Sequence, residues 1–403
     1  MNGEEEERYN KEALDLHERH HGKIEISVKV PMETGDDLSR AYTPGVAAVC
    51  QAISTDPSLA YRYTLKGNSI AIVTDGSAVL GLGNIGGTAS IPVMEGKAAI
   101  FREFAGIDAF PICFERYFPD IVEAIRNIAP VFGGINLEDI AAPRCFEIEE
   151  ELQDIGIPVM HDDQHGTAIT VLAALMNACR VTGKEFEDLC VVISGAGAAG
   201  YATARLLSCI GYRQDLCRKV GDIIVCDRQG IIHRERSGLY ANKYKFILAD
   251  ETNREGRSGT LTDAVEGADV FIGVSAPGIL SADMVRSMND DPVVFALANP
   301  VPEIKPEVAR QAGALVIGTG RSDVPNQINN ALAFPGVFRG ALDARATRIS
   351  DEMKIAAAHG LAEYLVTPSE DRILPAVTDH GVTRAVADAV IEAAFAYGYG
   401  REI

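Results

Sequence analysis

Four carboxylates occur as two adjacent pairs, and this arrangement predicts a divalent metal site. Glu138 and Asp139 follow the apolar stretch FGGINL, and Asp162 and Asp163 come just after the apolar stretch IPVM. If both stretches are parallel strands, their carboxyl ends meet at one edge of a sheet, where open α/β sheets hold ligands. Crowded carboxylates repel one another unless a cation joins them, and hard oxygen ligands suit Mg²⁺ or Mn²⁺. The alternative is that the acids only stabilise helix N-termini, which suits Asp163 ahead of a long helix.

Lys97 is the candidate for proton transfer. It falls within a helix predicted over residues 92–105, with Pro92 in its first turn. The apolar face of that helix is expected to contain Val93, Lys97, Ile100, Phe101 and Phe104. A buried ammonium group needs a carboxylate partner or a lowered pKa, and catalytic lysines use this property. The alternative is a lysine at the edge of the stripe whose ammonium group reaches water.

One tyrosine and two asparagines lie at the ends of predicted helices or strands, where their side chains can contribute to a substrate or cofactor site. Tyr42 precedes Thr43-Pro44, which is typical of an N-cap followed by proline at the first helical position. Its hydroxyl can face a cleft there, or its ring can form a hydrophobic staple. Asn299 ends the predicted strand VVFALA, and Asn329 opens a predicted helix. Amides at strand ends suit nicotinamide or a carboxylate substrate, although turn chemistry explains them equally well.

The pattern G-x-G-x-x-G occurs twice, and its context favours the second copy as a dinucleotide site. Residues 195–200 follow the strand LCVVIS, open an unbroken helix and precede the strand DIIVCD. A tight turn, a helix N-terminus and a strand-ending acid are the three parts of such a site. Residues 81–86 fit worse because Pro92 interrupts the segment after them, so a compact loop near a small substrate is expected there. The expected cofactor-binding residues are Gly195, Ala196, Gly197, Ala198, Ala199, Gly200, Asp227, Arg228 and Asn299.

The choice between NAD and NADP depends on two neighbouring residues. Asp227 ends its strand where a carboxylate bonds the ribose 2′-hydroxyl of NAD and repels the 2′-phosphate of NADP. Arg228 follows, and a guanidinium there can instead bind that phosphate. Because Asp227 ends the strand whereas Arg228 starts a turn, the sequence favours NAD with weak NADP use.

The chain length and the alternation of predicted strands and helices indicate a two-domain α/β protein. The 403 residues suit two domains, and 47% hydrophobic with 23% charged residues excludes a disordered or fibrous chain. We expect an N-terminal α/β substrate and metal domain over residues 1–164. Residues 165–403 should form a doubly wound, Rossmann-like NAD(P)-binding domain, since short β-branched strands alternate with helices. Two closing helices, at about 350–366 and 379–397, are expected to pack back across the domains.

Charge and cysteine usage bear on partners and location. A net charge of −20 repels nucleic acid and anionic membranes, so neither is an expected partner. The sequence contains no apolar run long enough to span a bilayer, and its acidic N-terminus lacks the apolar core of a secretory signal. The eight cysteines are scattered without a C-x-x-C pair. We therefore expect small buried thiols in a reducing cytoplasm, without disulfides or zinc sites.

Taken together, these segments resemble the malic enzyme family in its short bacterial and archaeal form. The resemblance covers nearly the whole chain from about residue 25. The motifs that carry it are AYTPGVA (41–47), VLGLGNIGG (79–87), PVMEGKAAIFREFAGIDAFPI (92–112), INLEDI (135–140), HDDQHGTA (161–168), SGAGAAG (194–200), ANP (298–300) and NQINNALAFPG (326–336). Their number and order are specific. Larger members that resemble this family place an arginine before VLGLG, where this chain has Ala78.

The resemblance implies metal-dependent oxidative decarboxylation of L-malate to pyruvate and CO₂ with reduction of NAD(P)⁺. It implies a catalytic acid at Tyr42, a base at Lys97 beside Asp162, and substrate or nicotinamide amides at Asn299 and Asn329. The implied metal ligands are Glu138, Asp139 and Asp163. A homodimer is the expected assembly. Two alternatives remain: a malolactic enzyme that keeps its NAD bound and releases lactate, and a nucleotide-sensing protein without turnover.

Overall fold

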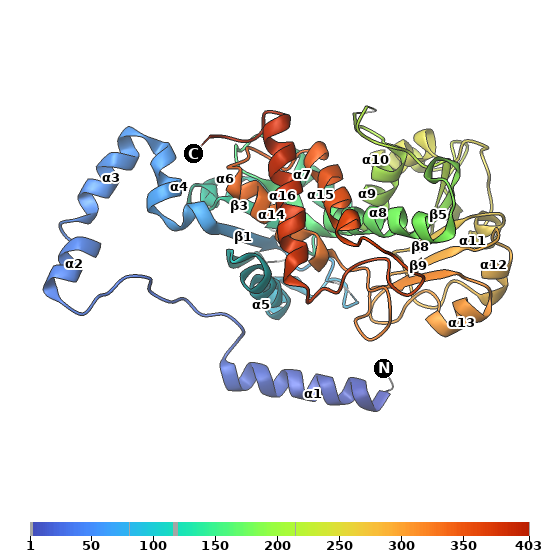
Figure 1. Cartoon of the computed structure of the whole chain (residues 1–403), viewed down its shortest axis with the longest axis horizontal. Coiled ribbons are helices and arrows are strands. Elements are labelled where there is room, and N and C mark those ends of the chain that lie inside the picture. The colour runs from blue at the N-terminus through green and yellow to red at the C-terminus, as the bar shows by residue number, and fades with distance from the viewer. Residues whose placement is uncertain (1–2, 80, 116–119, 214, 403) are drawn as a thin grey trace.

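Two β-sheets, each built mainly of parallel strands, lie side by side along the long axis of the molecule (Figure 1). The computed structural model describes residues 3–79, 81–115, 120–213 and 215–402, so Leu80 of the expected VLGLG motif lies outside the described residues. The first sheet has the strand order β2-β1-β3-β4 with all pairs parallel. Its strands are β1 Ser69–Thr74, β2 Asp108–Cys113, β3 Gly134–Leu137 and β4 Val159–His161.

The second sheet has the order β10-β9-β8-β5-β6-β7, and only the edge strand β7 is antiparallel. Its strands are β5 Cys190–Ser194, β6 Asp222–Asp227, β7 Gly230–Ile231, β8 Val270–Gly273, β9 Val293–Ala296 and β10 Val316–Thr319. The first strand of this sheet in chain order, β5, lies in the middle. Strands β6 and β7 lie on one side of β5, and after a crossover β8, β9 and β10 lie on the other side. The reversal between β5 and β8 is the topological switch point at which doubly wound sheets bind dinucleotides. The predicted Rossmann-like sheet is therefore confirmed.

Helices cover both sheets, and the apolar core extends from one sheet into the other. A second cluster lies on the other face of the six-stranded sheet. The helices between the strands are α5 Gly86–Ala105, α6 Ile121–Ile128, α7 Arg144–Glu151, α8 Asp162–Thr182, α9 Ala198–Ser208, α10 Lys243–Glu251, α11 Leu261–Val265, α12 Ala282–Arg286 and α13 Pro306–Gln311. The last three are α14 Phe334–Asp343, α15 Asp351–Tyr364 and α16 His380–Ala396. Helices α14 and α16 contact α5, which precedes β2 of the first sheet, and α15 packs on α8. The expected boundary between residues 164 and 165 falls within α8.

Helix α5 begins at Gly86, and the predicted start at Pro92 is wrong. Gly86 has a φ of +79°, a turn geometry that glycine adopts without strain, and it leads straight into the helix. Pro92 lies inside α5, where it removes one backbone donor but does not end the helix. The first glycine pattern therefore also leads into an unbroken helix, so Pro92 does not distinguish it from the second.

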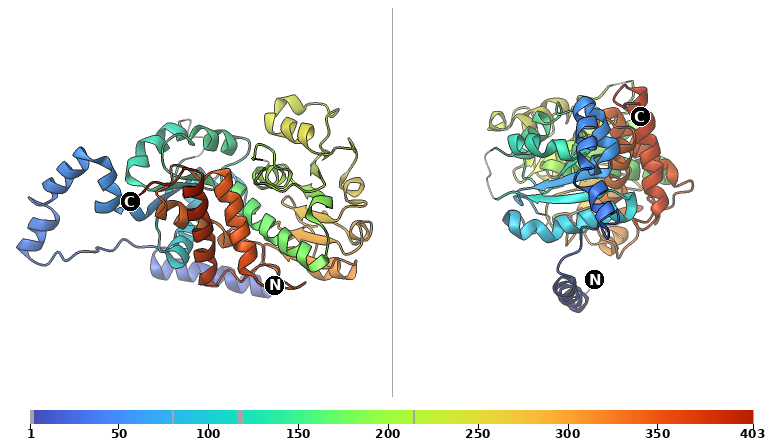
Figure 2. Two further views of the ribbon diagram at one scale, coloured as in Figure 1. Left: turned by 45° about the horizontal axis from the view of Figure 1, so that its top comes forward. Right: turned by 90° about the vertical axis from the view of Figure 1, so that its left-hand side faces the viewer.

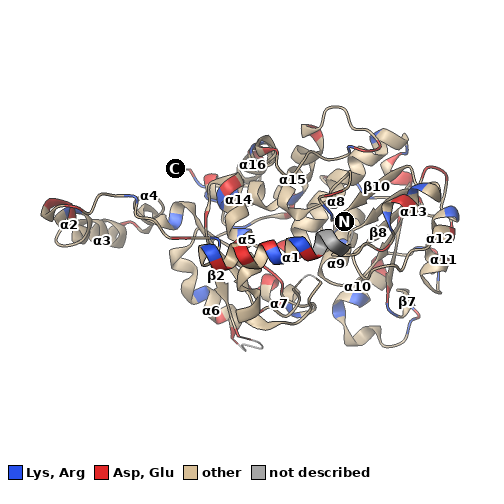
Figure 3. Cartoon of the chain, turned by 90° about the horizontal axis from the view of Figure 1, so that it is seen from below, with Lys and Arg blue, Asp and Glu red and all other residues tan. Residues whose placement is uncertain are grey.

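An N-terminal arm extends away from the two sheets (Figures 1 and 2). Its helices are α1 Gly3–His20, α2 Gly35–Ala41, α3 Val46–Thr55 and α4 Ala60–Tyr63. Helix α1 carries charges of both signs along its length (Figure 3), and no residue of α2 or α3 is buried. Between α1 and α2 the chain is extended, with Ile26 87% and Val28 74% exposed. The arm thus has no core of its own.

The expectation that no cysteine forms a disulfide is wrong for one pair. Cys209, which follows α9, is bonded to Cys217 in the next loop. The other six cysteines are free, and Cys50 is exposed on the arm instead of buried. The absence of a C-x-x-C motif does not exclude a disulfide bond, because the turn after α9 brings Cys209 and Cys217 together. In the part of the chain that the structure describes, none of the helices has the length and apolar character that crossing a membrane requires.

Candidate active site

Three carboxylates meet at the carboxyl edge of the first sheet. Glu138 and Asp139 follow β3, and Asp163 lies in the first turn of α8 directly after β4. One oxygen from each of these three side chains lies within 4.8 Å of the others. The backbone N–H of Asp139 donates to Asp163 Oδ2 at 2.8 Å, and Asn136 Nδ2 donates to Glu138 Oε2 at 2.9 Å. The two strand ends therefore meet as the sequence pattern predicts.

The electrostatics of this cluster fit a divalent cation. Burial raises the pKa of Glu138 to about 7, and Asp163 adds to this effect although Lys97 opposes it. Burial also raises the pKa of Asp163 to about 6, with Asp162 adding and Lys97 opposing. Carboxylates that resist ionisation because they are buried together are stabilised when a cation joins them. The oxygen-only donor set suits Mg²⁺ or Mn²⁺.

Lys97 extends from α5 into this cluster. Its Nζ contacts the carboxylate of Asp162 and lies 2.5 Å from Glu138 Oε1. Burial by itself lowers the pKa of Lys97, but Asp162, Glu138 and Asp163 outweigh it and hold the pKa above its usual value. Burial raises the pKa of Asp162 to about 7 against the opposing effect of Lys97. The pair therefore holds a proton in the middle of the carboxylate cluster.

The apolar face predicted for α5 is displaced around the helix. Val93 is 43% exposed, whereas Lys97 and Phe101 are buried as predicted. The buried face consists of Gly87, Ser90, Met94, Lys97, Ala98 and Phe101. Because the helix begins earlier than Pro92, its packing face includes residues that the sequence pattern did not cover. Lys97 is thus well inside the face, which argues against a lysine that reaches water.

Tyr42 does not lie near these groups within the chain. It is the C-cap of α2 in the N-terminal arm, and it is 69% exposed. Thr43 is not an N-cap: α3 begins at Val46 and Gly45 occupies the N-cap position. The residues between Tyr42 and Val46 form turns that complete α2 before α3 starts. The structure therefore brings Lys97 to the carboxylates but leaves Tyr42 on the arm.

The second glycine pattern forms the turn between β5 and α9. Gly195 has a φ of +122°, and a Cβ on Gly200 would lie 1.8 Å from Gly195 O, so both positions require glycine. Gly197 is the N-cap of α9, and Ala198 and Ala199 begin the helix. The turn lines a cavity of about 1030 Å³ that also contains Asp227 and Arg228. This is the arrangement in which a helix N-terminus faces a pyrophosphate.

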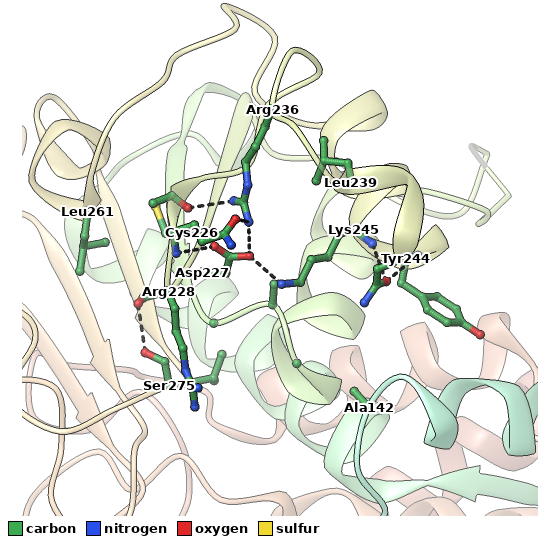
Figure 4. Close-up of a pocket in the computed structure, with 18 of the residues that line it drawn as sticks. Ala142, Cys226, Asp227, Arg228, Arg236, Leu239, Tyr244, Lys245, Leu261 and Ser275 are labelled. Atoms are coloured by element: carbon green, nitrogen blue, oxygen red, sulfur yellow. Dashed lines mark hydrogen bonds and ion pairs between the residues drawn. The ribbon is translucent and has the colours of Figure 1, made fainter.

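Asp227 lies in that cavity between two cations that the sequence did not predict (Figure 4). Arg236 Nη2 donates to Asp227 Oδ2 at 2.5 Å, and Lys245 Nζ donates to the same oxygen at 2.6 Å. Burial would raise the pKa of Asp227, but the hydrogen bonds from Arg236 and Lys245 lower it to about 2. Arg228 lines the same cavity. Asp227 is therefore ionised and its charge is compensated, which weakens the argument that it repels a 2′-phosphate.

The two predicted asparagines differ in their surroundings. Asn299 follows β9, and a Cβ on Gly81 would lie 3.2 Å from Asn299 O, so the first glycine turn and the β9 loop are neighbours. Asn329 caps the short helix Asn330–Leu332, because its Oδ1 accepts from the Ala331 N–H at 2.9 Å. The adjacent Asn330, which the sequence patterns did not single out, donates from Nδ2 to Asp162 Oδ2 at 2.6 Å.

A buried glutamate supports the start of α8. Glu149 of α7 is 7% exposed and accepts from the His161 N–H at 3.0 Å. Gln164 Nε2 donates to Glu149 Oε2 at 3.1 Å, and His165 Nε2 lies 2.9 Å from the same oxygen. Glu149 thus holds the turn that carries Asp162 and Asp163. Glu149 lies within the acidic stretch EIEEE (residues 147–151), and nothing in that stretch indicates that one of its glutamates is buried.

Comparison with known proteins agrees with this architecture. Residues 21–118 match the model of the malic enzyme N-terminal domain, and residues 164–395 match that of the malic enzyme NAD-binding domain. The NAD-dependent malic enzyme of Geobacillus stearothermophilus is 53% identical over 94% of this chain and 78% of its own length. The bifunctional malic/malolactic enzyme of Bacillus subtilis is 53% identical over 97% of this chain and 94% of its own length. The crystal structure of the NAD-dependent malic enzyme of Thermotoga maritima has a TM-score of 0.89 and 46% identity, and covers 94% of this chain and 98% of that chain.

The doubly wound sheet with its glycine turn defines a nicotinamide-dependent oxidoreductase. The chain belongs to the malic enzyme family. It oxidises L-malate and decarboxylates it to pyruvate and CO₂, with NAD(P)⁺ as the hydride acceptor.

Proposed function

We propose that Glu138, Asp139 and Asp163 hold the divalent cation that the malate oxidation requires. The observation that carries this proposal is that one carboxylate oxygen from each of these three side chains lies within 4.8 Å of the others. When bound, the cation supplies Lewis-acid stabilisation of the oxygen charge that develops on C2 of the substrate. The carboxylates fix its position, and the N–H of Asp139 fixes Asp163 in turn.

As the neutral amine, Lys97 takes the proton from the C2 hydroxyl of malate as the hydride leaves for the nicotinamide. The carboxylates around Lys97 raise its pKa, and a divalent cation bound to them would offset their charge and lower it. Asp162 contacts the lysine and has a pKa near 7, so the pair can release and recover a proton close to neutral pH. Asn330 donates to Asp162 and keeps its carboxylate turned toward Lys97. Asn299 and Asn329 orient the substrate or the nicotinamide. Tyr42 donates the proton that C3 of enolpyruvate accepts.

The active assembly is a homodimer in which Tyr42 serves the site of the other subunit. The support is the arm itself: α2 and α3 bury none of their residues, and Tyr42 is 69% exposed. Exposed apolar side chains such as Ile26 and Val28 are stabilised when a second copy covers them. A twofold dimer places equivalent arms on equivalent sites.

Mixing two inactive variants tests this arrangement. Lys97→Ala and Tyr42→Phe are each expected to be nearly inactive. If Tyr42 acts across the interface, unfolding and refolding the two together restores up to about a quarter of wild-type activity, because half of the dimers contain one complete site. Each variant refolded alone is the control. No recovery in the mixture would mean that Tyr42 serves its own chain or is not catalytic.

We propose that NAD is the preferred cofactor and that NADP is also accepted. Asp227 ends β6, where a carboxylate bonds the ribose hydroxyls of NAD. Arg228, Arg236 and Lys245 line the same cavity and provide positive charge for a 2′-phosphate. Release of reduced cofactor into solution distinguishes oxidative decarboxylation from malolactic turnover, in which lactate leaves and no free reduced cofactor accumulates. Absorbance at the reduced nicotinamide band with malate, Mn²⁺ and either cofactor measures this.

A further inference from the structure

Glu303 is a fully buried acid in the loop after β9. It is 0% exposed, and its two carboxylate oxygens have different backbone partners. Oε1 accepts from the Ser275 N–H at 3.0 Å, and Oε2 accepts from the Ala298 N–H at 3.0 Å. Ser275 follows β8, whereas Ala298 follows β9. One side chain therefore joins the exits of two neighbouring strands.

These exits lie on the nicotinamide side of the switch point. The acid for the adenosine ribose, Asp227, ends β6 on one side of β5, so the other end of an extended dinucleotide lies over β8 and β9. Ser275 lines the same cavity as the glycine turn. The hydroxyls of Ser275 and Ser194 lie 3.0 Å apart, which connects the β8 loop to the residue before Gly195. Asn299 directly follows Ala298.

The position between the β8 and β9 loops requires a carboxylate on a side chain as long as that of glutamate. Among the ion pairs of the described residues, none includes Glu303. Burial raises the pKa of its carboxyl, and the N–H groups of Ser275, Ala298 and Glu303 itself oppose this effect. A glutamine offers one acceptor oxygen and would point its NH₂ group at the other N–H donor. A Cβ on Gly273 would lie 2.3 Å from the carboxyl carbon of Glu303, so glycine at that position leaves room for the acid.

We propose that Glu303 is a positioning residue that fixes the spacing of the β8 and β9 loops and thereby places the nicotinamide ring beside C2 of malate. It acts through the backbone of Ser275 and Ala298 and does not touch the reacting atoms. Loss of one of its two hydrogen bonds lets one loop move, and a small displacement of a bound reactant reduces the rate strongly. The adenosine half of the cofactor, held at the end of β6, is not affected.

The test compares binding of the whole cofactor with binding of its adenosine half. In Glu303→Gln, the dissociation constant of NAD⁺ is expected to rise about tenfold and kcat to fall about tenfold, because a displaced β8 or β9 loop misplaces the nicotinamide ring. The dissociation constant of 5′-AMP is expected to stay within about twofold, because its contacts lie on the β6 side. Calorimetric titration of both ligands, steady-state kinetics with malate, and thermal unfolding give these quantities.

Glu307→Gln is the matched control, because Glu307 lies in the same segment and is exposed. The proposal is overturned if NAD⁺ affinity and kcat of Glu303→Gln stay within twofold of wild type. It is equally overturned if the affinities for NAD⁺ and 5′-AMP fall by the same factor, since that result means general destabilisation. If Glu303→Gln does not fold, Glu303→Asp, which keeps the charge on a shorter side chain, is judged by the same ratio of affinities.

Discussion

Lys245 Nζ donates a hydrogen bond to Asp227 Oδ2 at 2.6 Å, which joins α10 to the carboxyl end of β6. Arg236 donates to the same oxygen at 2.5 Å, so a carboxylate in the position of the NAD-selective acid is held by two cations. The other oxygen, Oδ1, accepts from the Gln229 N–H at 2.8 Å, so both oxygens of this acid already have partners within the chain. Arg228, Arg236 and Lys245 all line this cavity, so a 2′-phosphate bound there would lie in a region of positive charge. Discrimination between the two cofactors is therefore a balance between one acid and three cations.

This balance predicts the cofactor preference of single variants. Asp227→Ser should raise the NADP-to-NAD ratio of kcat/KM several-fold, because it removes a negative charge and frees Arg236 and Lys245 to bind the 2′-phosphate. Lys245→Ala and Arg228→Ala should lower that ratio, because each removes a cation near the phosphate. Initial rates with both cofactors at saturating malate measure the ratio.

Lys243→Ala is the control for this series. Lys243 lies two residues before Lys245 on α10 but pairs with Glu150 at 3.1 Å, so its loss should leave the ratio unchanged. A wild-type preference for NADP by an order of magnitude would mean that the cations outweigh Asp227 and that the proposed preference for NAD is wrong.

Removal of one proposed metal ligand should raise the metal requirement. Asp163→Ala should cut kcat by about two orders of magnitude or more and increase the Mn²⁺ concentration needed for half-maximal activity, because charge and geometry are lost together. Chelator should abolish the activity of the wild type. Asp290→Ala, at an exposed position, serves as the control. Full activity of Asp163→Ala without added metal would contradict the assignment.

Glu149 should contribute stability that depends on pH. Burial would raise its pKa, but His165 and Lys354 outweigh burial and lower the pKa to about 2, from a usual value of 4.5. Burial also lowers the pKa of His165, so at pH 6–7 the stabilisation comes from its hydrogen bond and from the charge of Lys354. Because the folded-state pKa is lowered, the stabilisation is complete above about pH 4.5 and is lost as the pH falls toward 2. Glu149→Gln should therefore reduce the free energy of unfolding by about 1–3 kcal/mol at pH 6–7.

Urea unfolding at several pH values checks this prediction. The difference between wild type and Glu149→Gln should shrink steadily below about pH 4.5. Glu147→Gln, on the exposed side of the same helix, should show no such pH dependence. A difference that stays constant between pH 6 and pH 3 would mean that the charge of Glu149 does not stabilise the fold.

Elements with strong local signals could be predicted from the sequence. The turn at Gly195 and the strand that ends in Asp227 were predictable because strand, glycine turn and helix are adjacent in the chain. The meeting of Glu138 with Asp163 was also predictable, since parallel strands place their carboxyl ends at one edge. The start of α5 was not, because Gly86 initiates the helix and Pro92 lies within it, so the local rule for proline pointed to the wrong residue.

Interactions between distant segments could not be predicted from local patterns. Arg236 and Lys245 reach Asp227 from a loop and a helix further along the chain, and no periodicity identifies them. Glu303 is similar, because its burial follows from the missing side chain at Gly273 on another strand. The disulfide between Cys209 and Cys217 depends on how the chain turns after α9. Tyr42 differs again: in the proposed dimer, its position relative to Lys97 would depend on the assembly and not on the fold of one chain.

Lys97→Ala and Tyr42→Phe should fail at different steps of the reaction. Lys97 contacts Asp162 and Glu138 at the carboxylate cluster, so its loss should abolish oxidation of malate while the cofactor still binds at the glycine turn. Tyr42→Phe keeps the ring and removes only the hydroxyl that we propose protonates C3. Its defect should therefore appear in the exchange of C3 hydrogens of pyruvate with deuterium oxide, measured by NMR in the presence of metal and reduced cofactor. Tyr63→Phe, at another exposed tyrosine of the arm, should exchange at the wild-type rate. Normal exchange by Tyr42→Phe would show that its hydroxyl is not the acid, because protonation of C3 and its reverse pass through the same group.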